Sequence, residues 1–195
     1  QMQQLPSLTG LQNLRYISLQ DNPNLRMIEL PFLPVLSHFS ASGCSQLRLL
    51  SCGQAPSLKH IQLSRCAELS EINGLASLNH LRVFILSSND CLLSLADLRS
   101  TSLTTLQLQD CLALTSLPLP ITTLSSLQVY GCKEIQNLDG LEHCTELMVL
   151  QLGGCSKVRR IPALELPKLK TLTLSWFQNL ESFPNLSALS SLETL

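Results

Sequence analysis

The sequence has few charged and few aromatic residues. Asp, Glu, Lys and Arg make up 14% of its 195 residues, and Phe, Trp and Tyr make up 4%, whereas an average globular protein has about 25% charged residues. Lys and Arg number 13 and Asp and Glu number 14, so no net charge favours binding to nucleic acid or to an anionic membrane. We expect neither as a partner.

Long apolar runs are also missing. No 18 consecutive residues are apolar, which argues against a membrane-spanning helix. Residues 1 to 4 have neither the positive charge nor the apolar stretch of a signal peptide. We therefore expect a soluble, cytoplasmic segment, with any targeting signals of a longer parent protein lying outside this chain.

Sequence motifs of common enzyme sites are absent as well. The chain contains no G-x-x-x-x-G-K-[ST] nucleotide loop, no H-E-x-x-H zinc motif, no paired C-x-x-C and no G-x-S-x-G nucleophile elbow. The sequence therefore predicts neither an enzyme nor a bound cofactor.

The dominant feature that is present is a repeat, which residues 103–118 show most clearly. This copy has apolar residues at offsets 0, 3, 5, 11 and 14 from Leu103 and a cysteine at offset 8. The template recurs every 21 to 23 residues, and all five slots are apolar in each of the eight complete copies. This period is typical of leucine-rich repeats. The copies start at Leu14, Leu36, Leu58, Leu81, Leu103, Leu124, Leu147 and Leu169, and a truncated ninth starts at Leu192.

The repeats predict a single array over residues 1–195. Residues 1–13 look like the outer half of a coil and residues 192–195 begin another strand, so partial repeats flank the eight complete ones. Neither end has the polar cap that a solenoid needs. We therefore expect a fragment of a longer protein.

Alternating polar and apolar residues, as in Thr105-Leu106-Gln107-Leu108, predict one half-buried strand per copy. The expected fold is an α/β solenoid of the leucine-rich-repeat class, with a curved parallel β-sheet on its inner face. Prolines such as Pro118 and Pro162 disfavour helices outside, so short turns, extended segments and 3₁₀ segments are expected there, with little α-helix. Strands are expected near Ile17, Phe39, Ile61, Phe84–Ile85, Leu106, Leu127, Leu150 and Leu172, and at most short helices near residues 75–79, 141–145 and 186–191.

The eight cysteines fit the repeat better than a disulfide scaffold. At offset 8 the chain leaves the sheet and needs a buried donor to backbone carbonyls, which an asparagine (Asn22, Asn89) or a cysteine can supply; Phe177 departs from this pattern. Free buried thiols are typical of a reducing compartment. A disulfide between neighbours such as Cys111 and Cys132 is the alternative. The cysteines in this slot are Cys44, Cys66, Cys111, Cys132 and Cys155.

Two histidines are the candidates for a metal site. His38 and His60 occupy the same offset in neighbouring copies, which places them about 5 Å apart on the sheet face. Their column neighbours Tyr16 and Val83 supply no third ligand, whereas zinc sites use three or four protein ligands. We expect no metal site.

The spacing L-x-x-L-x-x-L-x-L-x-x-C-x-x-L-x-x-L-P is followed along residues 166–184, with Phe177 at the cysteine position, and residues 150–156 (LQLGGCS) show its strand and turn. This pattern resembles the repeats of plant intracellular nucleotide-binding leucine-rich-repeat immune receptors, the disease resistance proteins. The resemblance covers essentially the whole chain. It implies the ligand-sensing and autoinhibitory repeat domain of such a receptor, with the nucleotide-binding switch elsewhere. The alternative is an architectural or regulatory scaffold similar to the cysteine-rich repeat proteins of trypanosomatids.

The solvent side of the sheet is expected to be mostly small and polar, with two exceptions. Val83 and Ile85 are β-branched, which fits strand propensity. The second exception combines aromatic residues and methionine, which protein interfaces favour, with glycines (Gly131, Gly153 and Gly154) that leave room for a partner. We expect this cluster to bind a protein, either foreign or the parent's own nucleotide-binding domain; a purely architectural spacer is the other function class. The expected partner-binding residues are Tyr130, Met148, Val149, Gln151, Lys170 and Trp176.

Overall fold

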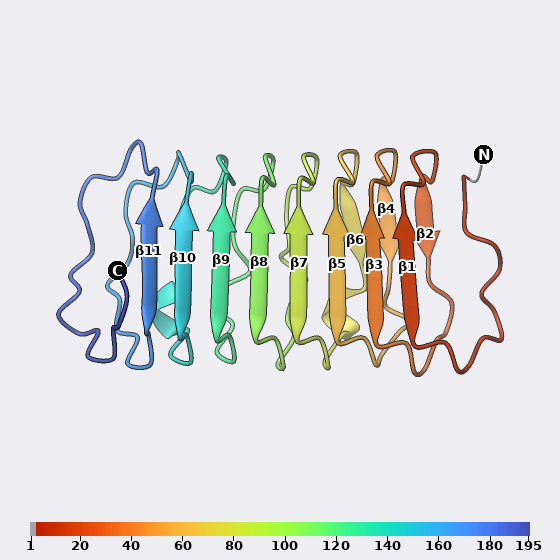
Figure 1. Cartoon of the computed structure of the whole chain (residues 1–195), viewed down its shortest axis with the longest axis horizontal. Coiled ribbons are helices and arrows are strands. Elements are labelled where there is room, and N and C mark those ends of the chain that lie inside the picture. The colour runs from red at the N-terminus through yellow and green to blue at the C-terminus, as the bar shows by residue number, and fades with distance from the viewer. Residues whose placement is uncertain (1–2) are drawn as a thin grey trace.

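The computed structural model describes residues 3–195, so the first two residues of the predicted array lie outside the described part. Its main feature is an eight-stranded parallel sheet to which each coil contributes one strand. The strands stand side by side along the molecule, and the two chain ends lie at opposite ends of this row (Figure 1). The strands are β1 (Tyr16–Gln20), β3 (His38–Ser42), β5 (His60–Ser64), β7 (Val83–Ser87), β8 (Thr105–Gln109), β9 (Ser126–Tyr130), β10 (Val149–Gly153) and β11 (Thr171–Ser175).

This sheet confirms the predicted leucine-rich-repeat solenoid, and every strand includes its predicted central residue. Neighbouring strands pair at equivalent repeat positions: Leu106 pairs with Leu127, and Leu127 pairs with Leu150. Because side chains alternate between the two faces of a strand, this register keeps all leucines on one face of the sheet and the polar residues on the other.

The core is a column of apolar side chains between the sheet and the outer arcs. Leu103, Leu106 and Leu108 are fully buried in it, and burying one such side chain stabilises the fold by about 1.5–3 kcal/mol. The equivalent residues Leu14 in the first coil and Leu174 in the last are only partly buried. Each coil is therefore stabilised mainly by its two neighbours.

The offset-8 slot after each strand is filled as the sequence predicts. The Cys111 thiol donates to the carbonyl of Gln109 in its own coil, with a distance of 3.6 Å from sulfur to oxygen. The amide of Asn89 donates to Ser87 at 3.2 Å and to Leu63 of the preceding coil at 3.0 Å. Phe177 fills the slot only in part and is half-buried. A donor in this slot satisfies carbonyls at the strand ends, where the sheet ladder stops.

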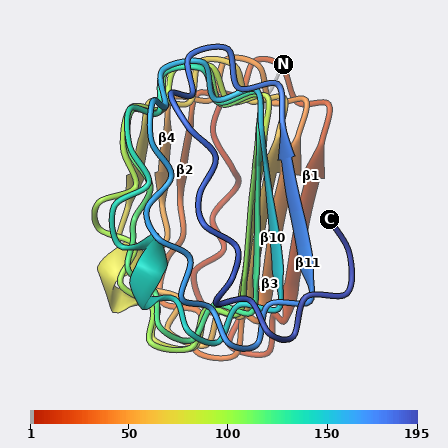
Figure 2. The same ribbon diagram turned by 90° about the vertical axis from the view of Figure 1, so that its left-hand side faces the viewer.

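The outer arcs contain a second sheet that the sequence pattern did not predict. Extended segments were expected there, but not their pairing. The second sheet has three short strands on the side away from the main sheet (Figure 2), which are β2 (Met27–Glu29), β4 (Leu49–Ser51) and β6 (Glu71–Asn73). In the fifth, seventh and eighth coils, Pro118, Pro162 and Pro184 follow the outer apolar residue and remove the backbone donor that a further strand would need. The fourth and sixth coils, which the structure describes in full, have Ala96 and Asp139 there and also form no outer strand, so proline alone does not set the extent of the second sheet.

Helical structure in residues 3–195 is limited to two 3₁₀ turns, η1 (Leu75–Ser77) and η2 (Leu141–His143). Both lie where short helices were predicted, and both follow a glycine with positive φ. The third predicted position, residues 186–191, forms turns instead. Within the described chain, no helix has the length and apolar character needed to cross a membrane.

Candidate functional site

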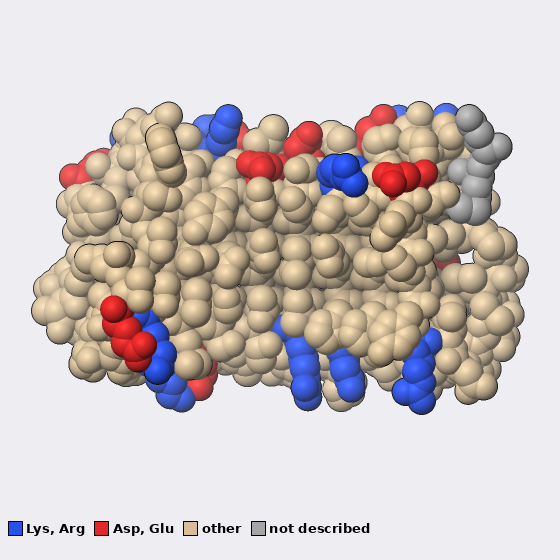
Figure 3. All heavy atoms as spheres, in the orientation of Figure 1, with Lys and Arg blue, Asp and Glu red and all other residues tan. Residues whose placement is uncertain are grey.

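The solvent face of the main sheet carries no charged side chain. Alternate residues of its eight strands point to solvent, and none of them is Asp, Glu, Lys or Arg. Gln107, Gln128 and Gln151, for example, lie side by side in β8, β9 and β10. The space-filling view shows charged side chains along the two edges of this face and uncharged atoms between them (Figure 3). The candidate interaction surface is therefore an uncharged polar sheet with a charged rim.

Tyr130, at the end of β9, lies over Gly153 of the next coil. A Cβ atom on Gly153 would be 2.9 Å from Cδ1 of Tyr130 and 2.6 Å from Oγ of Ser175. The carboxylate of Asp110 occupies the equivalent space at Gly131. The expectation that these two glycines leave room for a partner is therefore wrong, because side chains of this chain fill the space.

Trp176 lies just after β11, at the turn, and not on the sheet face where the sequence placed it. Its side chain is 85% exposed, and its φ is 57°. The left-handed backbone region is unusual for a bulky residue and costs about 1–3 kcal/mol. All eight residues at this repeat position have positive φ, and the other seven are Asp21, Gly43, Arg65, Ser88, Asp110, Gly131 and Gly154.

Met148 and Lys170 lie just before β10 and β11, at the opposite edge of the sheet from Trp176. Met148 is 42% exposed. The Lys170 ammonium is paired with the Glu193 carboxylate at 2.9 Å, so it is already neutralised. Met148, Lys170 and Trp176 therefore flank the sheet and do not belong to it.

The structure thus divides the expected partner-binding residues into two edge groups. Tyr130 and Trp176 lie at the ends of strands, whereas Met148 and Lys170 precede strands. Val149 and Gln151 lie between the groups on β10 and are half-buried, in register with Thr171 and Thr173 of β11. The sequence pattern did not predict where each strand ends. It shows which residues alternate between core and solvent, but it does not show at which residue the pairing between strands stops.

The histidines form a stack and not a shared ligand pair. The ring centroids of His38 and His60 are 4.3 Å apart with 5° between the planes, and Tyr16 stacks on His38 at 4.6 Å. An imidazole nitrogen binds a metal in the plane of its ring, so two parallel rings in this arrangement do not converge on one ion. No group of three or more His, Cys, Asp or Glu within residues 3–195 is placed to hold a metal.

All eight cysteines are free thiols, and only Cys91 is exposed. Burial raises the pKa of Cys52 to about 12 and that of Cys155 to about 11. A thiol with a raised pKa stays protonated and reacts poorly as a nucleophile. Cys52 and Cys155 therefore act here as small apolar residues with a weak S–H donor. Cys44 differs, because a hydrogen bond from Cys66 lowers its pKa to about 7.

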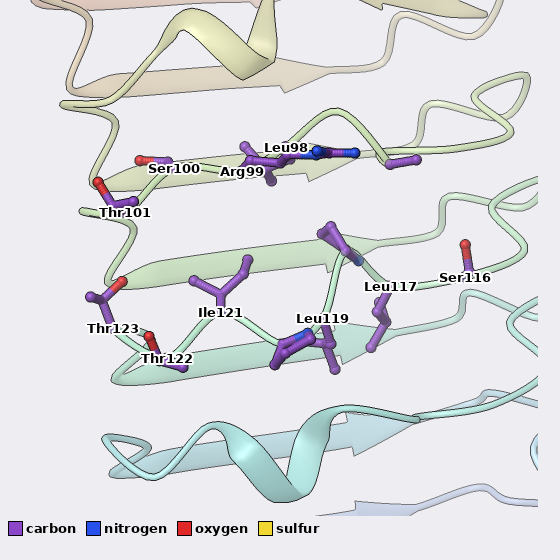
Figure 4. Close-up of a pocket in the computed structure, with 13 residues that line it drawn as sticks. Leu98, Arg99, Ser100, Thr101, Ser116, Leu117, Leu119, Ile121, Thr122 and Thr123 are labelled. Atoms are coloured by element: carbon purple, nitrogen blue, oxygen red, sulfur yellow. The ribbon is translucent and has the colours of Figure 1, made fainter.

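A pocket of about 500 Å³ opens on the outer arcs that follow β7 and β8. Ser100 and Thr101 come from one coil, and Ile121 and Thr123 come from the next (Figure 4). Arg99 is the one ionisable residue among those that line it. General acid–base and nucleophilic catalysis need a second group within hydrogen-bond reach, and the lining of this pocket does not supply one.

Comparison with known proteins gives a sequence relative and a similar solved structure. No protein-family profile matches the chain. Over 131 residues, the chain is 32% identical to the disease resistance protein RPS4B of Arabidopsis thaliana; this region covers 66% of the chain and 11% of that protein. Among solved structures, an internalin from Listeria monocytogenes aligns with a TM-score of 0.48 at 18% identity, covering 88% of this chain and 67% of the internalin.

The period, the parallel sheet and the relative point to the same class of protein. The repeat spacing predicts one strand per coil, and the main sheet takes one strand from each of eight coils. The relative is named for disease resistance and is much longer than this chain. The chain is therefore a leucine-rich-repeat array, a repeat module of the protein-interaction type, whose sequence resembles part of a plant disease resistance protein.

Proposed function

We propose that this chain is the partner-sensing repeat domain of an intracellular receptor in plant defence. In this proposal it binds a protein through the solvent face of the main sheet. The partner is either a foreign protein or the parent's own nucleotide-binding domain, and the location is the cytoplasm. The resemblance to RPS4B and the uncharged eight-stranded face support this function. Catalysis, a cofactor, nucleic acid and a membrane are not part of the proposal.

The observation that carries the proposal is the state of Trp176. Its indole is 85% exposed, which costs solubility. This cost is not recovered inside the chain, because so little of the side chain is packed. The positive φ is shared by all eight residues at this repeat position and belongs to the turn. A bound partner would cover the ring. Tyr130 lies on the same edge, at the end of β9, so the two aromatics form the proposed anchor, with Val149 and Gln151 beside them.

The test compares Trp176→Ala with wild type in partner capture. The purified chain is cross-linked in plant leaf extract, and bound proteins are identified by mass spectrometry. We expect Trp176→Ala to lose the specific partner, because truncating a central aromatic anchor weakens binding by about 2 kcal/mol or more. Its melting temperature should stay within a few degrees of wild type, since an exposed side chain contributes little to the core.

Phe183→Ala is the matched control, because Phe183 is 72% exposed but lies on the outer arc. It should retain the partner. If Trp176→Ala melts at a lower temperature and its folded fraction binds as wild type does, Trp176 only covers the last coil. A chain that captures no protein on this face, with or without Trp176, would instead support the architectural reading.

A further inference from the structure

A second surface lies at the other end of the same face, over β1, β3, β5 and β7. Arg15, Lys59 and Arg82 are exposed at one edge, each just before its strand. None of them forms a salt bridge within residues 3–195. Lys170 holds the same repeat position further along and is neutralised by Glu193. These three cations, the basic rim, are therefore free to bind an anion.

A hollow of about 260 Å³ lies on the sheet face beside the basic rim. His38 and His60 form one side of it, and Val83 and Ile85 form the other. Val83 is in register with His60, and Ile85 is in register with Gln62. Val83 on the apolar side of the hollow directly follows Arg82 in the chain. His60 on the imidazole side directly follows Lys59.

Ser37 anchors the His38 ring. Its Oγ lies 2.8 Å from His38 Nδ1 and 3.1 Å from the Arg15 carbonyl oxygen. The hydroxyl has one proton, so the tautomer of His38 decides which of these two atoms accepts it. In either tautomer the ring is held through Nδ1, and Nε2 is the nitrogen left for a partner.

The surroundings of His60 disfavour its protonation while the surface is empty. Burial lowers the pKa of His60 most, and the neighbouring His38, Arg82 and Lys59 lower it further. These ionisable groups come from β3 and from the residues preceding β7 and β5, and all of them are basic. An added carboxylate would reverse their effect, since an opposite charge nearby favours the imidazolium.

We propose that this part of the sheet docks an acidic, extended segment of a protein partner, with an apolar side chain in the hollow and carboxylates on the basic rim. The proposal rests on the proposed function and adds the chemistry of the partner. Lys59 and Arg82 precede neighbouring strands, which are about 5 Å apart, and Arg15 is two coils from Lys59, about 10 Å away. An extended segment rises about 3.3 Å per residue, so carboxylates two or three residues apart match these cations.

Charge distribution favours an acidic segment over nucleic acid. The chain has a formal net charge of −1, and Asp21 and Asp110 lie at the strand-end edge of the same face. Nucleic-acid affinity depends on neutralising many phosphates. Arg65 lies between these two acids at that edge, so the edge is mixed in charge. Three cations without a further basic edge suit a short acidic stretch better than a long polyanion.

The test is a titration of the full 195-residue chain, followed by amide NMR. The probe is a short synthetic peptide of glutamates around one leucine, and the matched probe has glutamine in place of every glutamate. We expect shifts at Arg15, His38, Lys59, His60 and Arg82 with the acidic peptide only. Lowering the pH from about 8 to about 6 should tighten binding, because a carboxylate that raises a histidine pKa by one unit binds about tenfold more tightly to the charged ring.

The variant Arg15→Gln/Lys59→Gln/Arg82→Gln should bind the peptide about tenfold more weakly, since each exposed pair contributes modestly. The charge-matched control Arg26→Gln/Arg99→Gln/Lys133→Gln removes three other exposed cations that lack salt bridges and should bind as wild type does. Equal loss in the two variants would overturn the proposal, as would tighter binding of a single-stranded oligonucleotide. Trp176→Ala should leave peptide binding unchanged, so this proposal and the proposed function fail separately.

Discussion

The carboxylate of Asp110 occupies the space in which Gly131 of the next coil would carry a Cβ atom, and Asp21 does the same at Gly43. All four residues have positive φ. At each position the backbone N–H donates to the strand end of the following coil; Asp110 donates to Tyr130, and Gly131 donates to Gly153. Asp followed by Gly one coil later is thus a matched pair at the turn.

Gly131→Ala should destabilise the fold by about 1–2 kcal/mol or more, since alanine is strained at φ 66° and its methyl group meets Asp110. The free energy of unfolding in urea measures this loss. Asp110→Gly/Gly131→Ala should recover the part caused by the contact, because the acid is gone. If the double variant is no more stable than Gly131→Ala, the contact with Asp110 does not matter and backbone strain accounts for the whole loss.

Gly153→Ala tests the position of Tyr130. Its methyl group would displace the Tyr130 ring, whereas the Ser175 hydroxyl can rotate away. Gly153 does not have positive φ, so we expect a loss of stability below about 1 kcal/mol. Capture of the partner should fall as it does for Trp176→Ala. Unchanged capture in this variant would show that the seated position of Tyr130 is not needed for binding.

Asn89→Ala should be among the more damaging single changes. It removes the buried donor to Leu63 and Ser87 and leaves both carbonyls without that partner, at a cost of about 1–3 kcal/mol plus the lost packing. Asn89→Cys should cost clearly less, because cysteine occupies this slot in five other coils. Midpoints of urea unfolding compare the two variants. Equal losses would mean that the slot needs the amide and that cysteine is not its equivalent.

The fold could be predicted because each coil repeats one set of local rules. Eight copies of the same alternation fix the strand position, and the parallel register follows when copies stack. The pairing of β2, β4 and β6 could not be predicted in this way. It depends on whether the next coil has a free backbone N–H at the matching position, and Pro118 shows only that the fifth coil does not.

The candidate site was predicted less completely for a related reason. The pattern identifies which side chains leave the core, but not which neighbour covers them. Gly153 was expected to leave room for a partner and is covered by Tyr130. Lys170 was expected to bind a partner and is paired with Glu193. Trp176 was assigned to the sheet because the alternation does not reveal that pairing ends at Ser175.

Acidification should reduce stability partly through His60. Its pKa is lowered in the folded chain by burial, His38, Arg82 and Lys59, from a usual value of 6.5. The unfolded chain then binds the proton more readily, so this contribution is complete above about pH 6.5 and is lost as the pH falls toward the folded pKa. Melting temperatures across this range should fall less for His60→Gln than for wild type. His80→Gln, an exposed control, should follow wild type, and an equal pH dependence in all three proteins would contradict the assignment.

Thiol accessibility tests the cysteine slot and the redox state together. Seven cysteines are buried and Cys91 is exposed, so a polar alkylating reagent should add once to the native chain and at all eight positions after unfolding. Cys91→Ser should abolish the native adduct. The raised pKa of Cys52 and Cys155 slows their reaction further, because the thiolate is the reactive form. Intact-mass spectrometry counts the adducts.

The redox state is tested on parent protein isolated without oxidant, in which peptide mapping locates any disulfide. A bridge between neighbours such as Cys111 and Cys132 in that sample would contradict both the free-thiol slot and the proposed cytoplasmic location, since such bonds are rare where thiols are kept reduced.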